Sequence, residues 1–161
     1  MELELTDKEA QKFITIIKKI LNIKKILKKY NIDLSKKNYG TISIYSETIK
    51  REFVLNYMAK IGEVHLNFAD AKTHLTLVRI NLDNRFHKNS DGMVRGHRVE
   101  IFSEAEFSAK NDGRTHYKAY PLPYKSIKDT DSFYEALESI LKYTNTNKNG
   151  MLSINTGFQF Q

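Results

Sequence analysis

Apolar residues recur at three- and four-residue spacing over the first part of the chain, which is the period of an amphipathic α-helix. The series comprises Phe13, Ile16, Ile17, Ile20, Ile23, Leu27 and Tyr30. Thr6 and Glu9 fit a capping box at its start, because the Thr6 hydroxyl can accept the Glu9 amide and the Glu9 carboxylate can reach back. The spacing therefore predicts a helix from about Asp7 to Tyr30, roughly 35 Å long.

From Gly40 onward the hydrophobic period changes to two, which is typical of β-strands with one buried face. We expect strands over residues 41–46, 52–60, 63–68, 73–82, 98–102 and 115–120. The apolar positions of the 73–82 strand change sides near Val78, which predicts a β-bulge. Pro121 ends the last of these strands, because proline cannot continue a central ladder.

A second amphipathic helix is predicted after these strands. Asp129 or Thr130 can cap its first turn, and Phe133, Leu137 and Ile140 lie on one stripe. Residues 151–161 form a last short strand or a docked tail. The predicted fold class is α+β, an antiparallel sheet of about five to six strands flanked by an N-terminal and a C-terminal helix. We expect residues 1–161 to form a single basic domain.

The charge balance of the chain favours a polyanionic partner. There are 26 basic and 19 acidic residues, for a net charge of +7. Such a balance speeds association with polyanions, and we expect RNA before DNA. Three lysines, Lys18, Lys25 and Lys29, fall on the polar side of the first predicted helix, where they could follow a phosphate backbone. The alternative is that lysine simply fills the solvated face of a packed helix.

The stretch 83–98 is polar and rich in turn residues, and we expect a long, functional loop there. Arginine forks onto phosphates and stacks on bases, and Phe86 adds a face for an unpaired base. With Lys118 on a later strand, the predicted nucleic-acid-binding residues are Lys18, Lys25, Lys29, Arg85, Phe86, Lys88, Arg95, Arg98 and Lys118. The alternative is a solvated hairpin tip that is basic by chance.

The same stretch offers an acid–base set. His87 and His97, with Glu100 close by in the sequence, could cleave RNA without a metal by activating the 2′-OH and protonating the leaving oxygen. The alternative is that these histidines bind phosphate or nothing.

Metal and cofactor chemistry have weaker support in the sequence. His65, Asn67 and His74 could share a sheet face, with Glu63 or Asp70 as a further ligand. Their ordinary spacing favours a solvated sheet face instead, and we predict no metal site and no cofactor. The chain lacks phosphate-loop, GxGxxG, GxSxG and HExxH motifs, which argues against nucleotide hydrolysis, dinucleotide redox chemistry, serine hydrolysis and zincin proteolysis.

The absence of cysteine excludes disulfides, thiolate metal sites and a cysteine nucleophile. The N-terminus is acidic and has no signal-peptide core, and no window is apolar enough for a membrane span. We therefore expect a cytoplasmic protein with no membrane contact.

Residues of about 75–125 resemble a family of small uncharacterised proteins carried by phages and mobile elements of low-GC Gram-positive bacteria. The H-x-N-x-D-G loop of that family is matched by His87, Asn89, Asp91 and Gly92. The following strand has His97 and Glu104, and the Tyr/Ala-Pro-Leu stretch is found at 117–123. The chain departs from the pattern at 99–100, where Val and Glu stand in place of a second His. The resemblance implies no established activity, but a mobile-element origin favours toxin, antitoxin or anti-defence roles.

Three functions follow as hypotheses. The first is an RNA-binding protein, in a phage setting one that blocks a host defence nucleoprotein such as a CRISPR-type complex. The second is a metal-independent endoribonuclease of the toxin type. The third is an inhibitor whose basic loop docks on an acidic protein surface. A homodimer is compatible with each of them.

Overall fold

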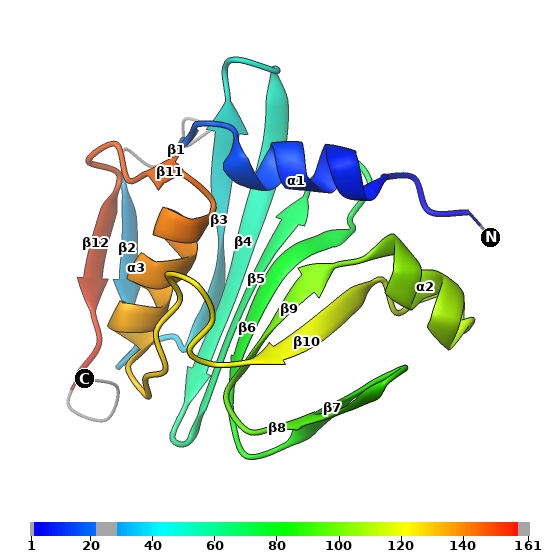
Figure 1. Ribbon diagram of the computed structural model, residues 1–161. Coiled ribbons are helices and arrows are strands. Elements are labelled where there is room, and N and C mark those ends of the chain that lie inside the picture. Colours follow the sequence, from blue (N-terminus) through cyan, green and yellow to red (C-terminus); the bar gives the residue numbers. More distant parts are fainter. Residues whose placement is uncertain (1, 22–28, 158–161) are drawn as a thin grey trace.

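The computed structural model of the protein describes residues 2–21 and 29–157 (Figure 1). Its main sheet contains β1 (Lys18–Ile20), β3 (Tyr39–Ser46), β4 (Arg51–Lys60), β5 (Glu63–Asp70), β6 (Thr76–Leu82), β9 (Arg98–Phe102), β10 (Tyr117–Pro121) and β11 (Thr146–Asn147). The eight strands lie in the order β10-β9-β6-β5-β4-β3-β1-β11. Every neighbouring pair is antiparallel except β1 with β11.

Two smaller strand pairs and three helices complete the described chain. β2 (Tyr30–Asp33) pairs in parallel with β12 (Leu152–Asn155), and β7 (Phe86–Asn89) forms a hairpin with β8 (Gly92–Arg95). The helices are α1 (Asp7–Thr15), α2 (Glu104–Lys110) and α3 (Phe133–Tyr143). The α+β class and the mostly antiparallel sheet are confirmed. The expected five to six strands and two helices are corrected to an eight-stranded main sheet and three helices.

The main sheet has one apolar and one polar face. The apolar side chains include Phe53, Leu55 and Phe68, all buried, and α1 and α3 pack against the sheet, as Figure 1 shows. Phe13 of α1 meets Phe53 edge-on with ring centroids 5.7 Å apart. The polar face carries the residues that alternate with the core positions, among them Asn56, Asn67, Arg79, Asn81 and Glu100.

The first predicted helix is shorter than its apolar spacing indicated. The capping box is confirmed, but α1 ends at Thr15 and the chain enters β1 two residues after the extended C-cap Ile16. Lys18 is the reason, because its ammonium donates to the carbonyl oxygens of Ile14 at 3.0 Å, Ile16 at 2.7 Å and Thr144 at 2.5 Å. Lys18 is therefore part of the core rather than a phosphate ligand.

The predicted bulge is confirmed at the β5–β6 pair. Phe68 pairs with Val78 and Ala69 with Thr76, so Leu77 is the additional residue of β6. Leu77 and Val78 are consequently both buried, which explains the change of sides in the sequence.

Several local predictions need correction. The stretch 83–98 is a hairpin rather than a loop, and α3 is capped by Ser132, not by Asp129 or Thr130. α2, capped by Ser103, and the parallel β2–β12 pair were not predicted. Within residues 2–21 and 29–157, none of the helices has the length and apolarity that crossing a bilayer requires.

Candidate functional site

The β7–β8 hairpin is fastened to the free edge of the main sheet. Asn89, which is buried, donates its side-chain amide to the Ala119 carbonyl and accepts the Ala119 N–H, both at 2.9 Å. The Asn89 side chain thereby pairs the backbone N–H and C=O of Ala119, which lies on the edge strand β10. The buried Glu106 of α2 accepts the Ser90 hydroxyl at 3.0 Å and the Ser90 N–H. The hairpin is thus held by both the sheet and α2.

The strand register divides the hairpin side chains into two sets. Phe86 lies opposite Arg95 and Lys88 opposite Met93, whereas His87 and Asn89 alternate with them. We call Phe86, Lys88, Met93 and Arg95 the outer face of the hairpin. Phe86 is 50% exposed and Met93 59% exposed, so two large apolar side chains of this face are open to solvent.

The outer face combines an exposed ring with two cations. The guanidinium carbon of Arg95 lies 5.1 Å from the centroid of the Phe86 ring. Lys88 is exposed on the neighbouring position of the same face. In the described part of the chain, neither Lys88 nor Arg95 forms an ion pair with a carboxylate. This combination of a flat ring and free positive charge can stack on a nucleobase and contact the adjacent phosphates.

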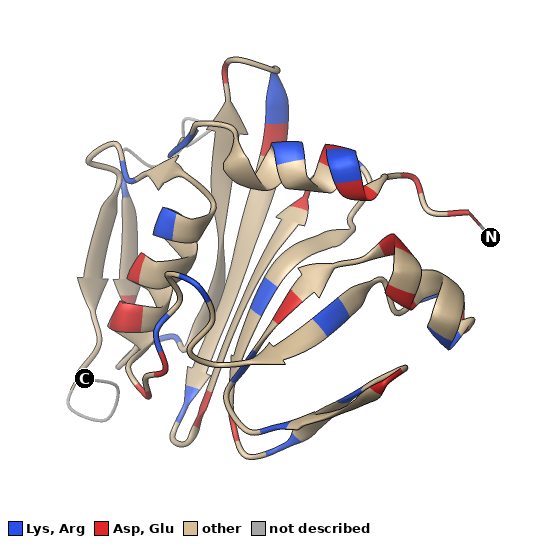
Figure 2. Ribbon diagram, in the orientation of Figure 1, with Lys and Arg blue, Asp and Glu red and all other residues tan. Residues whose placement is uncertain are grey.

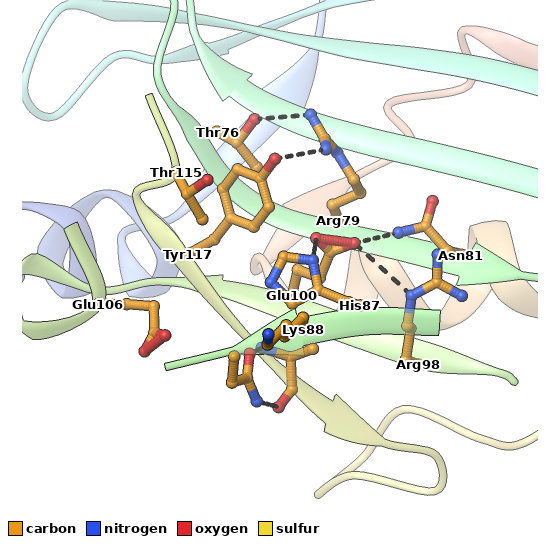
Figure 3. Close-up of polar contacts among 12 residues, drawn as sticks. Thr76, Arg79, Asn81, His87, Lys88, Arg98, Glu100, Glu106, Thr115 and Tyr117 are labelled. Carbon is orange, nitrogen blue, oxygen red and sulfur yellow. Dashed lines mark hydrogen bonds and ion pairs between the residues drawn. The ribbon is translucent and has the colours of Figure 1, made fainter. Parts of the chain in front are cut away.

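The opposite side of the hairpin covers a buried polar cluster. His87 lies beneath it with Nδ1 3.5 Å from Oε2 of Glu100 and its ring 5.6 Å from that of Tyr117 (Figure 3). Glu100 also accepts the side-chain amide of Asn81. Burial lowers the pKa of His87, with a further contribution from Lys110 and Arg98, and burial raises the pKa of Glu100. Both shifts favour the neutral forms of the pair.

Of the predicted acid–base set, the structure brings His87 and Glu100 together and leaves His97 apart. His97 Nδ1 lies 2.8 Å from Asp129 and its Nε2 lies 3.2 Å from Asp131, in the segment before α3. His87 meets Glu100, but the Glu100 side chain is 3% exposed and out of reach of a substrate phosphate while the hairpin is docked.

The predicted cations are dispersed rather than gathered, and Figure 2 shows Lys and Arg interleaved with Asp and Glu over the elements. Arg98 is buried and donates to Asp83 at 2.7 Å, because its side chain lies on the polar sheet face beneath the hairpin. Arg85 pairs with Glu63, and Lys118 with Asp91 at 2.9 Å. Arg98 is thus corrected from a phosphate ligand to a structural residue.

Two predicted lysines lie apart from the hairpin or outside the described residues. Lys29 is exposed and immediately precedes β2, and Figure 1 shows β2 on the far side of the molecule from the β7–β8 hairpin. Lys25 lies outside the described residues. The predicted residues that the structure brings together in an accessible position are therefore Phe86, Lys88 and Arg95.

A hollow of about 290 Å³ lies on the polar sheet face, and of its lining residues the prediction from sequence named His65 and Asn67. It is lined by Asn56, Tyr57, Met58, His65, Asn67, Arg79 and Asn81. Arg79 donates to Asn67 at 3.3 Å and to the Tyr117 hydroxyl at 3.2 Å, as Figure 3 shows for Tyr117. The signal in the sequence was the polar residues at alternate positions of the predicted 73–82 strand.

The expectation that His65, Asn67 and His74 share a sheet face also needs correction. The register places Asn81 opposite His65 and Arg79 opposite Asn67. His74 lies outside β6 in a left-handed turn position with φ of 64°.

The comparison with protein families identifies the chain at the level of a family. Residues 5–146 match the model of a family of unknown function (DUF6978). The chain belongs to this family. The match extends well beyond residues 75–125, and the matched residues include α1, β1 to β10 and α3 of this chain. No curated protein and no solved structure matches this DUF6978 chain.

Proposed function

We propose that the protein binds single-stranded RNA through the outer face of the β7–β8 hairpin. The observation that carries the proposal is the half-exposed Phe86 ring with the Arg95 guanidinium against it and Lys88 beside it. Stacking of a base on an aromatic side chain contributes about 1–3 kcal/mol and tolerates any base, because every base has a π-face.

The rigidity of the hairpin supports this proposal. Asn89 and Glu106 hold the hairpin from its inner side, so the outer face is ordered before a ligand arrives. A preordered surface loses little conformational entropy on binding. The outer face has two cations, Lys88 and Arg95, which predicts modest affinity with a shallow salt dependence, roughly −0.7 in log–log slope for each phosphate contacted on a single strand.

The proposal extends to the target, which we propose to be RNA in a host nucleoprotein complex. A phage or mobile-element origin, which the resemblance at residues 75–125 suggests, would give an RNA-binding protein a use against a host defence complex. The protein would then occupy RNA that the complex presents.

Copurification tests the proposal. The wild-type protein is expected to elute at low salt with an A260/A280 ratio well above that of protein alone, and to lose the excess at high salt. Phe86→Ala is expected to carry less nucleic acid. Tyr39→Ala is a matched control, because Tyr39 is also 58% exposed and has the Lys37 ammonium 4.8 Å from its ring centroid. Equal loss in both variants, or a wild type free of RNA that captures an acidic protein instead, would refute RNA binding by the outer face.

A further inference from the structure

Three potential metal ligands converge where β5 begins and β6 ends. Glu63 and His65 lie on the same face of β5, and Asp83 follows the last residue of β6. The register pairs Val64 with Leu82, so Glu63 and Asp83 are brought next to each other. One ligand atom from each of the three lies within 4.8 Å of the other two. Nε2 of His65 is 3.8 Å from Oε2 of Glu63 and 3.9 Å from Oδ2 of Asp83.

Arginines occupy the other oxygen of each carboxylate. Arg85 pairs with Oε1 of Glu63, and Arg98 donates to Oδ1 of Asp83 at 2.7 Å. The backbone N–H of Arg85 also donates to Oδ1 of Asp83, at 2.9 Å. The oxygens that remain, Oε2 and Oδ2, are those nearest to His65.

The imidazole is oriented by an amide oxygen. Nδ1 of His65 lies 2.6 Å from Oδ1 of Asn81, and the amide nitrogen of Asn81 is taken by Glu100. An amide oxygen only accepts, so Nδ1 carries a hydrogen, and Nε2 is the nitrogen that faces the two carboxylates and is placed to ligate an ion. A ligating histidine in metalloproteins is held in this way through its second nitrogen.

One of the ligand atoms is buried without a partner. The Asp83 side chain is 1% exposed, and its Oδ2 has no hydrogen-bond partner within the described residues. Leaving a buried carboxylate oxygen unpaired is destabilising. The three potential ligand atoms of Glu63, His65 and Asp83 thus lie around one point, and a cation bound at that point would stabilise them.

We propose that Glu63, His65 and Asp83 bind a divalent transition-metal ion. Ligand atoms bonded at about 2.1 Å in a tetrahedral site lie roughly 3.4 Å apart, so each of the two distances from His65 Nε2 needs a contraction of about half an ångström. Glu63 and His65 are partly exposed, and their side chains can make that adjustment. One imidazole and two carboxylates suit a borderline ion, and the general affinity order gives Zn²⁺ above Co²⁺ above Mn²⁺.

The site leaves coordination positions for water or a ligand. Three protein ligands with an open position are the arrangement of metal sites that act on a substrate. His65 also lines the hollow on the polar sheet face, so a ligand bound in the hollow can reach the ion from the side of His65. The inference is independent of the RNA proposal, because none of the outer-face residues belongs to the three ligands.

Metal titration tests the inference. After chelator treatment and dialysis, the wild-type protein is expected to bind one equivalent of Co²⁺ with visible d–d absorption bands, and Zn²⁺ is expected to displace it. His65→Gln and Glu63→Gln are each expected to weaken Co²⁺ binding by more than the roughly 10–100-fold that loss of an outer partner causes. Circular dichroism and thermal melting show whether each variant is folded. Substitution of Glu63 tests the site better than substitution of Asp83, because Asp83→Asn would also remove the buried ion-pair partner of Arg98.

The matched control is a second histidine with two carboxylate neighbours. His97 lies within 3.2 Å of both Asp129 and Asp131, but Asp131 is 97% exposed and both carboxylates are solvated. His97→Gln is expected to leave Co²⁺ binding unchanged. The inference is overturned if the wild type binds neither Co²⁺ nor Zn²⁺, or if folded His65→Gln binds as the wild type does. Phe86→Ala is expected to bind the ion normally, so failure of the RNA proposal leaves this test intact.

Discussion

Arg95 holds its guanidinium carbon 5.1 Å from the centroid of the Phe86 ring, directly across the β7–β8 hairpin. A cation over an aromatic face attracts the ring quadrupole and restricts both side chains. The other side of the hairpin is fixed by Asn89, whose amide makes two hydrogen bonds to Ala119. The RNA proposal depends on this order, because a ring that is free to collapse on the surface presents no stacking plane.

Loss of the Asn89 anchor is expected to release the hairpin. Asn89→Ala removes both bonds to Ala119 and should lower the free energy of unfolding by about 2 kcal/mol. RNA affinity should fall as well, although every outer-face side chain remains. Hydrogen exchange checks this directly, since the Ala119 N–H should exchange faster in the variant. Unchanged exchange at Ala119 would show that the amide does not hold the hairpin.

Lys18 is expected to stabilise the fold and to make stability depend on pH. Its ammonium is enclosed by three backbone carbonyls and lies 5.4 Å from the centroid of the Phe68 ring. Lys18→Met leaves those carbonyls without a donor and should lower the free energy of unfolding by roughly 3 kcal/mol, because buried acceptors are left unpaired. Denaturant titrations of both proteins measure the difference.

The pH dependence of Lys18 has a definite sign. Burial lowers the pKa of Lys18 to about 7, below the value of 10.5 expected in the unfolded chain. Between these values the unfolded state binds more protons, so the stability of the wild type relative to Lys18→Met should rise from pH 7 toward pH 10. A difference that stays constant over this range would contradict the assignment.

RNA incubated with the protein and EDTA is expected to remain intact. Glu100 is buried beneath the hairpin, and His97 is engaged with Asp129 and Asp131 instead of facing His87. Neither an accessible acid nor an accessible base then meets a 2′-OH. Gel analysis over several hours measures the outcome. Cleavage by the wild type that disappears in His87→Ala would favour the ribonuclease hypothesis over this account.

The sequence predicted the strands better than the first helix, for a physical reason. In the strands, alternation such as that of Val64, Leu66 and Phe68 reflects burial of one face, which is a local property. The segment after Thr15 follows helical spacing, but its structure is decided by Lys18 and by the Thr144 carbonyl, which lies 126 positions along the chain. No local pattern contains that contact.

The same distinction applies to the sites. Phe86, Lys88 and Arg95 could be selected from sequence because the hairpin keeps them on one exposed face. Arg98 could not be separated from them, since its burial with Asp83 depends on the β6–β9 register. The group of Glu63, His65 and Asp83 likewise depends on the register of β5 with β6, which places Glu63 beside Asp83 and which the spacing of residues in the sequence does not give.

Fluorescence anisotropy of a labelled single-stranded RNA, recorded over a range of salt concentrations, tests the RNA proposal most directly. The account predicts that Phe86→Ala combined with Arg95→Ala lowers affinity at least about tenfold and flattens the salt dependence by roughly one phosphate contact, or about 0.7 in log–log slope. Tyr39→Ala should match the wild type. A wild type that does not bind the RNA, or a double variant with the same affinity and slope as the wild type, would contradict it.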